Sequence, residues 1–197
     1  MQNRINHSIF APMKNFTLED IWFQIKYEVS PGIHTYHACP ICGNMCRSLY
    51  CQNCWHKIRM AQHGMIIAVD FDGTVVDTFN YPGFNGPMPG VRKSVNQLRK
   101  DGHTLILNTL RNGEYLDQAI RFLSKERISF NFINESHPLN VYAYGQADRK
   151  VGADLYIDDR SIGFSSHFSP DTMWFSFYQL IQDQHEHIKM EVSSWEF

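Results

Sequence analysis

The stretch Met65–Asp77, MIIAVDFDGTVVD, is the part of the sequence from which the rest of the fold follows. Within it, Ile66–Val69 is a short run of apolar, mostly β-branched residues, which is typical of a strand buried on both faces. The run ends abruptly at two carboxylates, Asp70 and Asp72, which are followed by a glycine and a threonine. Like charges this close together raise each other's proton affinity unless a cation lies nearby. This strand end therefore predicts a functional site.

The two carboxylates allow two interpretations. In the functional one, Asp70 is a nucleophile or a metal ligand and Asp72 is its partner in proton transfer, because both project into the crevice beyond the strand. In the other, they belong to an acidic turn that Gly73 closes. The apolar character of the strand and the Gly73-Thr74 pair that follows favour the functional interpretation.

Apolar strands alternate with amphipathic helices along the chain after Asp77. The expected elements are, in order, a helix that begins after Gly90 and ends near Lys100, a strand over His103–Asn108, a helix over Glu114–Lys125, a strand over Ile128–Ile133, a strand over Ala153–Ile157 and a helix over Thr172–Asp183. This alternation predicts an α/β fold with a doubly wound parallel sheet.

Polar residues follow each expected strand. They are Asp70 and Asp72, Thr109 and Arg111, Asn134 and Glu135, and Asp158 and Asp159. Each pair alone is also consistent with a helix cap or a loop. In parallel sheets, however, ligands bind beyond the carboxyl ends of the strands, so the convergence of these residues predicts an active site.

The composition fits one medium-sized domain with a small appendage. The 197 residues are 43% hydrophobic and 14% aromatic, which is enough for a packed core and excludes general disorder. The net charge of −2 argues against a strong overall attraction to nucleic acid. Residues 1–63 hold six Lys and Arg against three Asp and Glu, whereas residues 64–197 hold twelve against seventeen, so only the first part is mildly basic.

No apolar run approaches the length of a membrane span, and the N-terminal residues lack the hydrophobic region of a signal peptide. We therefore expect a soluble cytoplasmic protein with no membrane partner. We expect three regions: an N-terminal helix and zinc-ribbon region over residues 1–63, the α/β domain over residues 64–184, and a tail over residues 185–197. The helix should begin near Thr17, and residues 57–64 should form a connector.

All five cysteines lie between Cys39 and Cys54, which is unlike the spread of a disulfide framework. Four of them form two C-x2-C pairs, Cys39 with Cys42 and Cys51 with Cys54, and two such pairs can complete a tetrahedral Zn²⁺ site. A redox dithiol and free thiols are the alternatives. Cys46 is a spare cysteine that can replace one ligand or simply be buried.

Three histidines lie nearby as alternative ligands, namely His34, His37 and His56. The stretch resembles a short zinc ribbon, whose closed site of four thiolates stabilises structure and does not catalyse. Zinc ribbons are often adaptors for nucleic acid or protein. The basic residues near the cysteines permit that role; they are Arg47, Lys57 and Arg59.

The polar strand ends resemble, in order, the four motifs of the haloacid dehalogenase superfamily of phosphatases and phosphotransferases. Asp70–Thr74 (DFDGT) resembles the first motif, Thr109 the second, Lys150 the third and Asp158–Asp159 the fourth. The wider pattern, with TLRNG, FINE and DLYIDDR at the later strands, is similar to a small capless branch of hydrolases. The resemblance spans about residues 65–160 and does not include the cysteine region.

The resemblance implies an enzyme in which Asp70 attacks phosphorus to form an aspartyl-phosphate and Asp72 exchanges protons with the leaving group and with water. It also implies a Mg²⁺ ion at the strand ends. The implied ligands are Asp70, Asp72 through its backbone carbonyl, Asp158 and, less directly, Asp159. Thr109 and Lys150 would bind phosphoryl oxygens. Arg111 is either a further phosphate contact or part of a surface ion pair.

Only 36 residues lie between Asp72 and Thr109, and 40 between Thr109 and Lys150, which leaves no room for a cap domain. The resemblance implies that capless members act on large substrates or borrow closure from a neighbouring subunit. The loop expected over Thr78–Gly90, which contains FNYPGFNGPMPG, or the cysteine region would supply part of the wall. We therefore expect a phosphomonoester phosphatase, with nucleotides or nucleic-acid ends as the most natural substrates and metabolites or phosphoproteins still open. The alternative is a zinc-ribbon adaptor for nucleic acid or protein, with the α/β domain as a scaffold.

Overall fold

The computed structural model describes residues 36–46, 51–138, 140, 150–161, 164 and 168–195. The chain forms two compact units. The smaller comprises Met1–Ile58 together with Glu191–Phe197, and the larger comprises Arg59–Met190. The N-terminal arm, the helix expected from Thr17, and the residues His34 and Arg47 lie outside the described residues.

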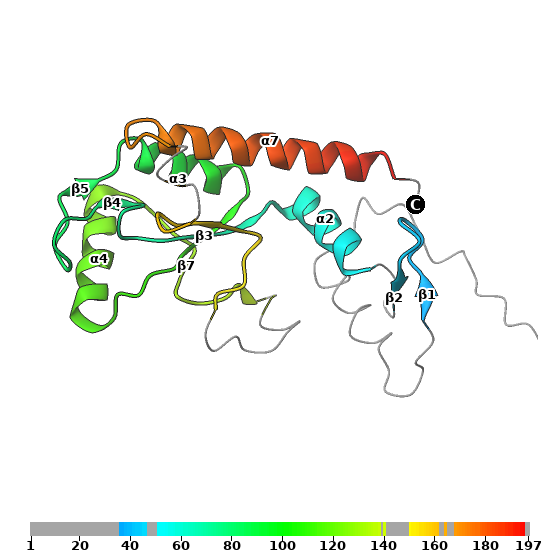
Figure 1. Cartoon of the computed structure of the whole chain (residues 1–197), viewed down its shortest axis with the longest axis horizontal. Coiled ribbons are helices and arrows are strands. Elements are labelled where there is room, and N and C mark those ends of the chain that lie inside the picture. The colour runs from blue at the N-terminus through cyan, green and yellow to red at the C-terminus, as the bar shows by residue number, and fades with distance from the viewer. Residues whose placement is uncertain are drawn as a thin grey trace, which may run out of the picture. The chain divides into compact units, whose positions relative to one another are not determined.

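The larger unit is built on a four-stranded sheet, part of which is labelled in Figure 1. Its strands are β3 (Ile66–Val69), β6 (Thr104–Leu107), β7 (Phe132–Ile133) and β8 (Leu155–Ile157). They lie in the order β7-β6-β3-β8, and every pair of neighbours is parallel. The expected α/β fold with a parallel sheet is therefore confirmed.

β3 is one of the two inner strands, since it pairs with β6 on one side and with β8 on the other. All four of its residues are buried. Ile66 and Ala68 pack with Ile106 of β6 on one face of the sheet. Because side chains alternate along a strand, Ile67 and Val69 lie on the opposite face, where both are fully buried.

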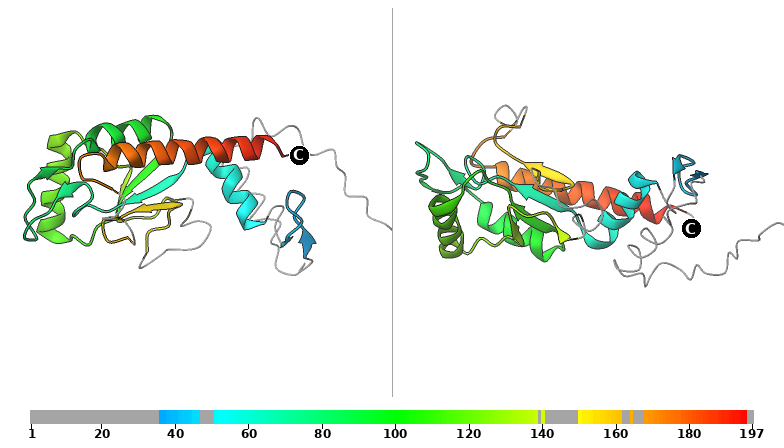
Figure 2. Two further views of the ribbon diagram at one scale, coloured as in Figure 1. Left: turned by 45° about the horizontal axis from the view of Figure 1, so that its top comes forward. Right: turned by 90° about the horizontal axis from the view of Figure 1, so that it is seen from below.

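The described part of the larger unit includes the helices α3 (Val91–Lys100) and α4 (Gly113–Glu126), and α7 (Met173–Ser193) as far as Met190. α3 and α7 lie side by side in Figures 1 and 2, and the Ser94 hydroxyl of α3 donates a hydrogen bond to the Trp174 carbonyl of α7 at 3.0 Å. Trp174 is fully buried, and its indole N–H donates to the Thr74 carbonyl at 2.8 Å. These contacts fix the first turn of α7 next to the loop that follows β3.

α7 continues well beyond Asp183, where the sequence pattern predicts its end. The cause is a buried face that includes a histidine, because Ile181, His185 and Ile188 are all buried at helical spacing. A ring nitrogen of His185 lies 2.9 Å from the Met60 carbonyl, which satisfies this polar side chain. Histidine counts as a polar residue in a hydrophobic pattern. The sequence therefore predicts a tail over residues 185–197, whereas α7 continues to Ser193 in the structure.

The segment expected to be a connector, residues 57–64, is mostly part of α2 (Gln52–His63). Arg59 of this helix is buried, and its guanidinium forms an ion pair with the carboxylate of Asp154. The same carboxylate accepts a hydrogen bond from the Ile66 N–H at 2.7 Å. An ion pair between residues this far apart in the chain cannot be deduced from the local sequence.

The strand expected over Ile128–Ile133 is shorter in the structure, because only β7 is a strand. Asn131, which precedes β7, bonds the neighbouring strand in a different way. Its N–H donates to the Leu105 carbonyl at 2.8 Å, and its side-chain oxygen accepts from the Leu105 N–H at 3.0 Å. An asparagine side chain thus replaces part of the regular ladder.

The loop expected over Thr78–Gly90 contains one strand of a short hairpin. The hairpin strands are β4 (Val76–Asp77) and β5 (Gly86–Pro87), which pair in antiparallel fashion. Phe84 anchors the connection between them, because its ring centre lies 5.4 Å from that of Phe71 and 4.8 Å from that of Phe122. The hairpin is therefore fixed next to the strand end that carries Asp70.

In the smaller unit, β1 (His37–Ala38) and β2 (Met45–Cys46) form an antiparallel pair. Three buried cysteines form a cluster beside them, and Ile41, Cys46 and Trp195 pack against it. Within the described ranges of the chain, no helix is both long enough and apolar enough to cross a membrane.

Candidate functional site

The chain changes direction in the sheet at β3. From β3 it continues to β6 and β7 on one side, and it then returns to β8 on the other side. In open parallel sheets such a switch point leaves a crevice at the carboxyl ends of the strands, and ligands bind there. Asp70 directly follows β3 and Asp158 directly follows β8, so the topology places both at this crevice.

Three carboxylates meet at the switch point. Carboxylate oxygens of Asp70, Asp158 and Asp159 all lie within 4.8 Å of one another, and each of these residues is half-buried. Hard divalent cations such as Mg²⁺ and Ca²⁺ take oxygen ligands of this kind. The cluster can therefore hold a metal ion, as the sequence predicts for these three residues.

The electrostatics of the cluster favour a cation. Burial raises the pKa of Asp70 to about 7. A hydrogen bond with the Phe71 backbone lowers this pKa, whereas the charges of Asp158, Asp159 and Asp72 raise it. Burial and the Asp158 charge likewise raise the pKa of Asp159. A divalent cation would remove this mutual repulsion and favour the ionised carboxylates.

The loops after β3 and β8 are in close contact. Gly73 has a φ of 76°, and a Cβ at this position would lie only 2.4 Å from a carboxylate oxygen of Asp159. The Asp159 N–H donates a hydrogen bond to the Thr74 hydroxyl at 3.0 Å. Position 73 therefore requires glycine, both for its backbone conformation and for the close approach of Asp159.

Asp72 is not one of the three clustered carboxylates, and it is held by Arg111. Arg111 donates from Nε to one oxygen of Asp72 at 2.8 Å and from Nη2 to the other at 2.6 Å. The Thr78 hydroxyl donates to the same carboxylate at 3.0 Å. A bidentate pair of this kind fixes the orientation of the carboxylate as well as its position.

The Arg111 side chain has 0% exposure. Its guanidinium carbon lies 5.0–5.2 Å from three aromatic ring centres, and Nη2 also donates to the Pro82 carbonyl at 2.9 Å. The three rings are those of Phe71, Tyr81 and Phe84. Nη1 has no hydrogen-bond partner among the described residues. The ion pair with Asp72 is thus buried on the arginine side, whereas the sequence suggested either a phosphate contact or a surface ion pair.

Thr109 follows β6 and is held by two hydrogen bonds. Its N–H donates to the side-chain oxygen of Asn134 at 2.8 Å, and its hydroxyl accepts the Arg111 N–H at 3.2 Å. Because Asn134 follows β7, the polar ends of these two neighbouring strands meet, as the sequence predicts. Glu135 is exposed.

Lys150 is directed toward a different partner. Its ammonium lies 4.5 Å from the ring centre of Tyr156 on β8. Among the described residues, no ion pair or hydrogen bond joins it to the clustered carboxylates. The structure therefore brings together Asp70, Asp158 and Asp159, and it does not bring Lys150 into contact with them.

The support of Asp72 could not be identified from the sequence. Thr78, Tyr81 and Phe84 lie in the aromatic stretch after the first strand, which suggested only a wall for the substrate. The available signal was the concentration of aromatic residues in FNYPGF, since arginine packs readily against aromatic faces. That signal does not say which arginine packs there.

The four cysteines of the two C-x2-C pairs meet in the smaller unit. Sulfur atoms of Cys39, Cys42, Cys51 and Cys54 all lie within 4.8 Å of one another, and those of Cys42 and Cys51 are 3.4 Å apart. The set can hold a zinc ion, as the sequence predicts. None of the described histidines belongs to it, and Cys46 packs against it from outside.

The protonation of the cysteines is uneven. Burial opposes ionisation of Cys39, but hydrogen bonds with the backbone of Cys51, Cys42 and Ile41 lower its pKa to about 6. Burial raises the pKa of Cys54, and the neighbouring cysteines raise it further. Zinc ligates thiolates, so metal binding would displace the protons that these sulfurs otherwise retain.

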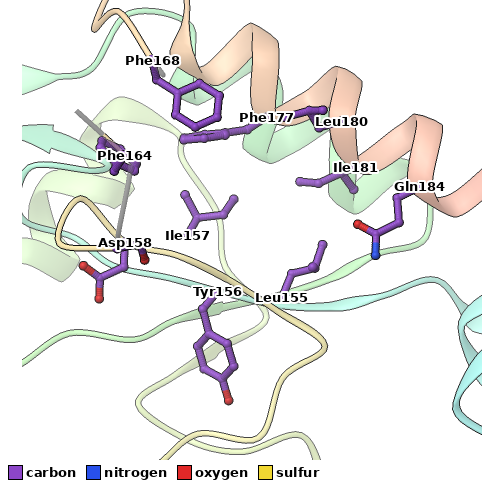
Figure 3. Close-up of a pocket in the computed structure, with 11 residues that line it drawn as sticks. Leu155, Tyr156, Ile157, Asp158, Phe164, Phe168, Phe177, Leu180, Ile181 and Gln184 are labelled. Carbon is purple, nitrogen blue, oxygen red and sulfur yellow. The ribbon is translucent and has the colours of Figure 1, made fainter. Parts of the chain in front are cut away.

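A cavity of about 410 Å³ lies beside β8 and α7, as Figure 3 shows. Its lining is mainly apolar, with Phe168 and Phe177 on one side and Ile157 of β8 on the other. Asp158 also lines it, so the cavity borders the carboxylate cluster. Because β8 is the last strand in the sheet order, the cavity lies at the edge of the sheet. No local pattern in the sequence indicates this cavity.

Fold and site together define a parallel α/β protein with a carboxylate cluster at the switch point of its sheet. No family model and no curated protein matches the chain. Among solved structures, a conserved protein of Bacteroides thetaiotaomicron is 36% identical in sequence; the match covers 61% of this chain and 91% of that chain, with a TM-score of 0.51. The chain belongs to the same family as that Bacteroides protein.

Proposed function

We propose that the larger unit is a Mg²⁺-dependent phosphomonoester hydrolase of the haloacid dehalogenase type. The observation that carries the proposal is the meeting of Asp70, Asp158 and Asp159 beyond the ends of β3 and β8. A half-buried strand-end aspartate with a raised pKa and two carboxylate neighbours suits a nucleophile that works beside a cation. The order of the four motifs along the chain adds support.

Asp70 supplies the nucleophile in this proposal. One of its carboxylate oxygens bonds to phosphorus as the bond from phosphorus to the ester oxygen breaks, which leaves an aspartyl-phosphate and an alcohol. Asp72 gives a proton to the departing oxygen and later takes one from the water that hydrolyses the aspartyl-phosphate. When bound, Mg²⁺ supplies charge neutralisation for the phosphoryl oxygens, and Asp70, Asp158 and Asp159 would hold it.

Arg111 acts as a positioning residue in this proposal. It occupies both oxygens of Asp72, so proton transfer by Asp72 requires one of these hydrogen bonds to open. Its burial beneath aromatic rings restricts the directions in which the pair can move. We assign phosphoryl contacts to the Thr109 hydroxyl and to the Lys150 ammonium, which would have to leave the Tyr156 ring.

We also propose that the sheet is doubly wound and that the domain lacks a cap. The interval between Asp72 and Thr109 holds the β4–β5 hairpin, α3 and β6, and these elements account for most of its length. An open site of this kind fits a phosphorylated substrate whose own bulk covers the reacting atoms. Nucleotides and nucleic-acid ends are substrates of this type.

The test of the reaction class is Mg²⁺-dependent phosphate release from p-nitrophenyl phosphate, nucleotides and phosphorylated oligonucleotides. We expect wild-type protein to release phosphate and the Asp70→Asn variant to be at least about 10³-fold slower, since it lacks the nucleophile. Wild type no faster than Asp70→Asn on every substrate would refute the proposal. A chelator followed by added Mg²⁺ tests the cation directly.

For the smaller unit we propose a structural zinc ion in the set of Cys39, Cys42, Cys51 and Cys54. The closed arrangement of four sulfurs supports this role and also favours a second function, that of an adaptor that binds nucleic acid or protein. Metal analysis of reduced protein should find about one zinc per chain, and much less would refute the zinc site. Salt-dependent retention on DNA or RNA that disappears without the cysteine region would favour the adaptor function.

A further inference from the structure

Exposed aromatic residues gather beside the Asp72 and Arg111 pair. Tyr81 is 57% exposed and Tyr115 42%, and Leu110, which directly precedes Arg111, is 95% exposed. We name Tyr81 and Tyr115, whose rings are in contact, the aromatic surface. Single exposed apolar side chains are ordinary on proteins, whereas several that share one location mark a binding surface.

The rings of the aromatic surface come from two segments that are far apart in the sequence. The ring centres of Tyr81, before β5, and Tyr115, in the first turn of α4, are 5.8 Å apart with an angle of 67° between the planes. Leu110 lies in the segment that connects β6 to α4, and Tyr115 lies just after that segment, in the first turn of α4. The surface therefore borders the strand end that carries Thr109.

Buried contacts hold the loop that carries Tyr81 in place. Phe84 packs between Phe71 and Phe122, and the Pro82 carbonyl accepts a hydrogen bond from the buried Arg111. The Asn85 N–H donates to the Asp77 carbonyl at 2.8 Å across the hairpin. These contacts hold the loop between β4 and β5 in place. Tyr81 is therefore exposed on a loop whose position is fixed.

The aromatic surface lies close to the proposed reaction site. The Arg111 guanidinium carbon is 5.1 Å from the ring centre of Tyr81, while its Nη2 is 2.6 Å from an oxygen of Asp72. The Tyr81 ring centre is thus at most about 9 Å from the carboxylate that would exchange protons with the leaving group. In a nucleotide, a single sugar separates the phosphate from the planar base.

We infer that the aromatic surface binds the nucleobase of a nucleoside phosphate whose phosphate group occupies the carboxylate site. This inference rests on the proposed hydrolase function and names its substrate class. Tyr81 and Tyr115 offer the base exposed aromatic rings, and stacking of this kind tolerates any base. The absence of a cap is then compensated by the substrate, because the base and sugar cover the reacting phosphate.

The decisive comparison is between nucleoside 5′-monophosphates and ribose 5-phosphate, which has the same phosphate and sugar but no base. Stacking predicts a KM about tenfold or more lower for the nucleotides. Tyr81→Ser and Tyr115→Ser should each remove most of this difference by raising KM for nucleotides. Tyr81→Phe keeps the ring and should retain the preference. Phe175→Ser removes an exposed ring on α7 and serves as the matched control, with the preference unchanged.

The source of the nucleoside phosphate is distinguished by a second pair of substrates. An oligonucleotide with a terminal phosphate should be preferred over the same oligonucleotide with an abasic terminal residue. The KM of the phosphorylated oligonucleotide with an intact terminal base is then compared with the KM of the mononucleotide. The lower of the two shows whether a nucleic-acid end or a free nucleotide is the better substrate.

Failure of this inference is distinguishable from failure of the hydrolase function. Binding of AMP and ribose 5-phosphate to the Asp70→Asn variant, measured by calorimetry, requires no turnover. Equal affinity for both ligands, or Tyr81 and Tyr115 variants that weaken both equally, would overturn the inference even in an active enzyme. If the affinity depends on the base but the wild-type protein releases no phosphate from any substrate, the inference is supported and the hydrolase function is contradicted.

Discussion

Both carboxylate oxygens of Asp72 accept hydrogen bonds from the guanidinium of Arg111, whose side chain has no contact with solvent. The aspartate side chain itself is 24% exposed, so the pair has one buried member and one that is partly exposed to solvent. This arrangement lets a fixed cation orient a carboxylate that remains accessible to a substrate. In the proposed reaction it sets the direction from which a proton reaches the leaving group.

Replacement of Arg111 by lysine should lower kcat/KM about 10- to 100-fold, because an ammonium cannot donate to both oxygens of Asp72 in a fixed geometry. The measurement is steady-state hydrolysis of p-nitrophenyl phosphate, with circular dichroism to confirm folding. Arg121→Lys, an exposed position on α4, is the control and should behave as wild type. Wild-type rates for Arg111→Lys would exclude a positioning role.

Replacement of Gly73 by alanine should weaken Mg²⁺ binding and destabilise the larger unit by about 1–3 kcal/mol, through a strained positive φ and a clash with Asp159. Gly102→Ala separates the two causes, since Gly102 has a φ of 93° and nothing lies within 4 Å of the added methyl. Both variants should lose stability in thermal denaturation. Only Gly73→Ala should lose Mg²⁺ affinity in calorimetry, and equal Mg²⁺ affinities would show that Asp159 is not displaced.

Stabilisation of the protein by Mg²⁺ should increase with pH. Because the pKa of Asp70 rises from 3.8 to about 7 on folding, the cation-free folded state retains a proton that the unfolded state releases, and stability falls as pH rises from about 4 to 7. In the proposed site Mg²⁺ would bind the ionised cluster and so restore this stability. The shift in Tm on adding Mg²⁺ should be small at pH 5.5 and large at pH 8. An equal shift at both values would contradict the assignment, and Asp70→Asn should flatten the dependence.

The protein should also lose stability in mild acid through His103. This residue is buried, its Nδ1 accepts the Met65 N–H at 3.0 Å, and burial together with the neighbouring His185 lowers its pKa from 6.5 to about 4. The unfolded state therefore takes up a proton first, so stability is fully present above pH 6.5 and is lost as pH falls toward 4, by at most about 3 kcal/mol. His103→Asn keeps an acceptor without titrating and should show a flatter profile in urea denaturation. An unchanged profile in that variant would assign the loss to other groups.

Removal of one zinc ligand should affect the protein far more than removal of the fifth cysteine. Cys51→Ser should lower the bound zinc to well below one per chain and destabilise the smaller unit, because structural zinc contributes directly to folding. Cys46→Ser is the matched control, since Cys46 lies outside the set of four. The readouts are metal analysis and protease resistance of the region around the cysteines. Equal zinc loss in both variants would mean that Cys46 also ligates the metal.

Much of the fold could be predicted because it depends on local patterns. The apolar run before Asp70 and the alternation of strands and helices were sufficient to predict a parallel α/β sheet, and the order of polar strand ends predicted that Asp70 and Asp158 would meet. Two C-x2-C pairs likewise predicted the cysteine set. In each case the information lies within a few residues, or follows from the rule that parallel strands end at one edge.

The remaining features depend on pairings between distant segments. Arg59 forms an ion pair with Asp154, Arg111 forms one with Asp72, and Lys150 lies against the ring of Tyr156. In each pair, the sequence offers the charged side chain several possible partners. The length of α7 was underestimated because a buried histidine interrupts its apolar pattern. Such choices are made by tertiary packing, which a local reading of the sequence does not contain.

The pairing of Arg59 with Asp154 determines where the larger unit can be cut from the rest of the chain. A fragment that starts at Gly64 would retain every strand of the sheet but would leave the Asp154 carboxylate without its guanidinium. An uncompensated charge of this kind costs several kcal/mol, comparable to the whole stability of many domains. The last turns of α2 thus belong to the sheet-containing unit, and any gene fusion or domain exchange that preserves this unit would have to carry them along.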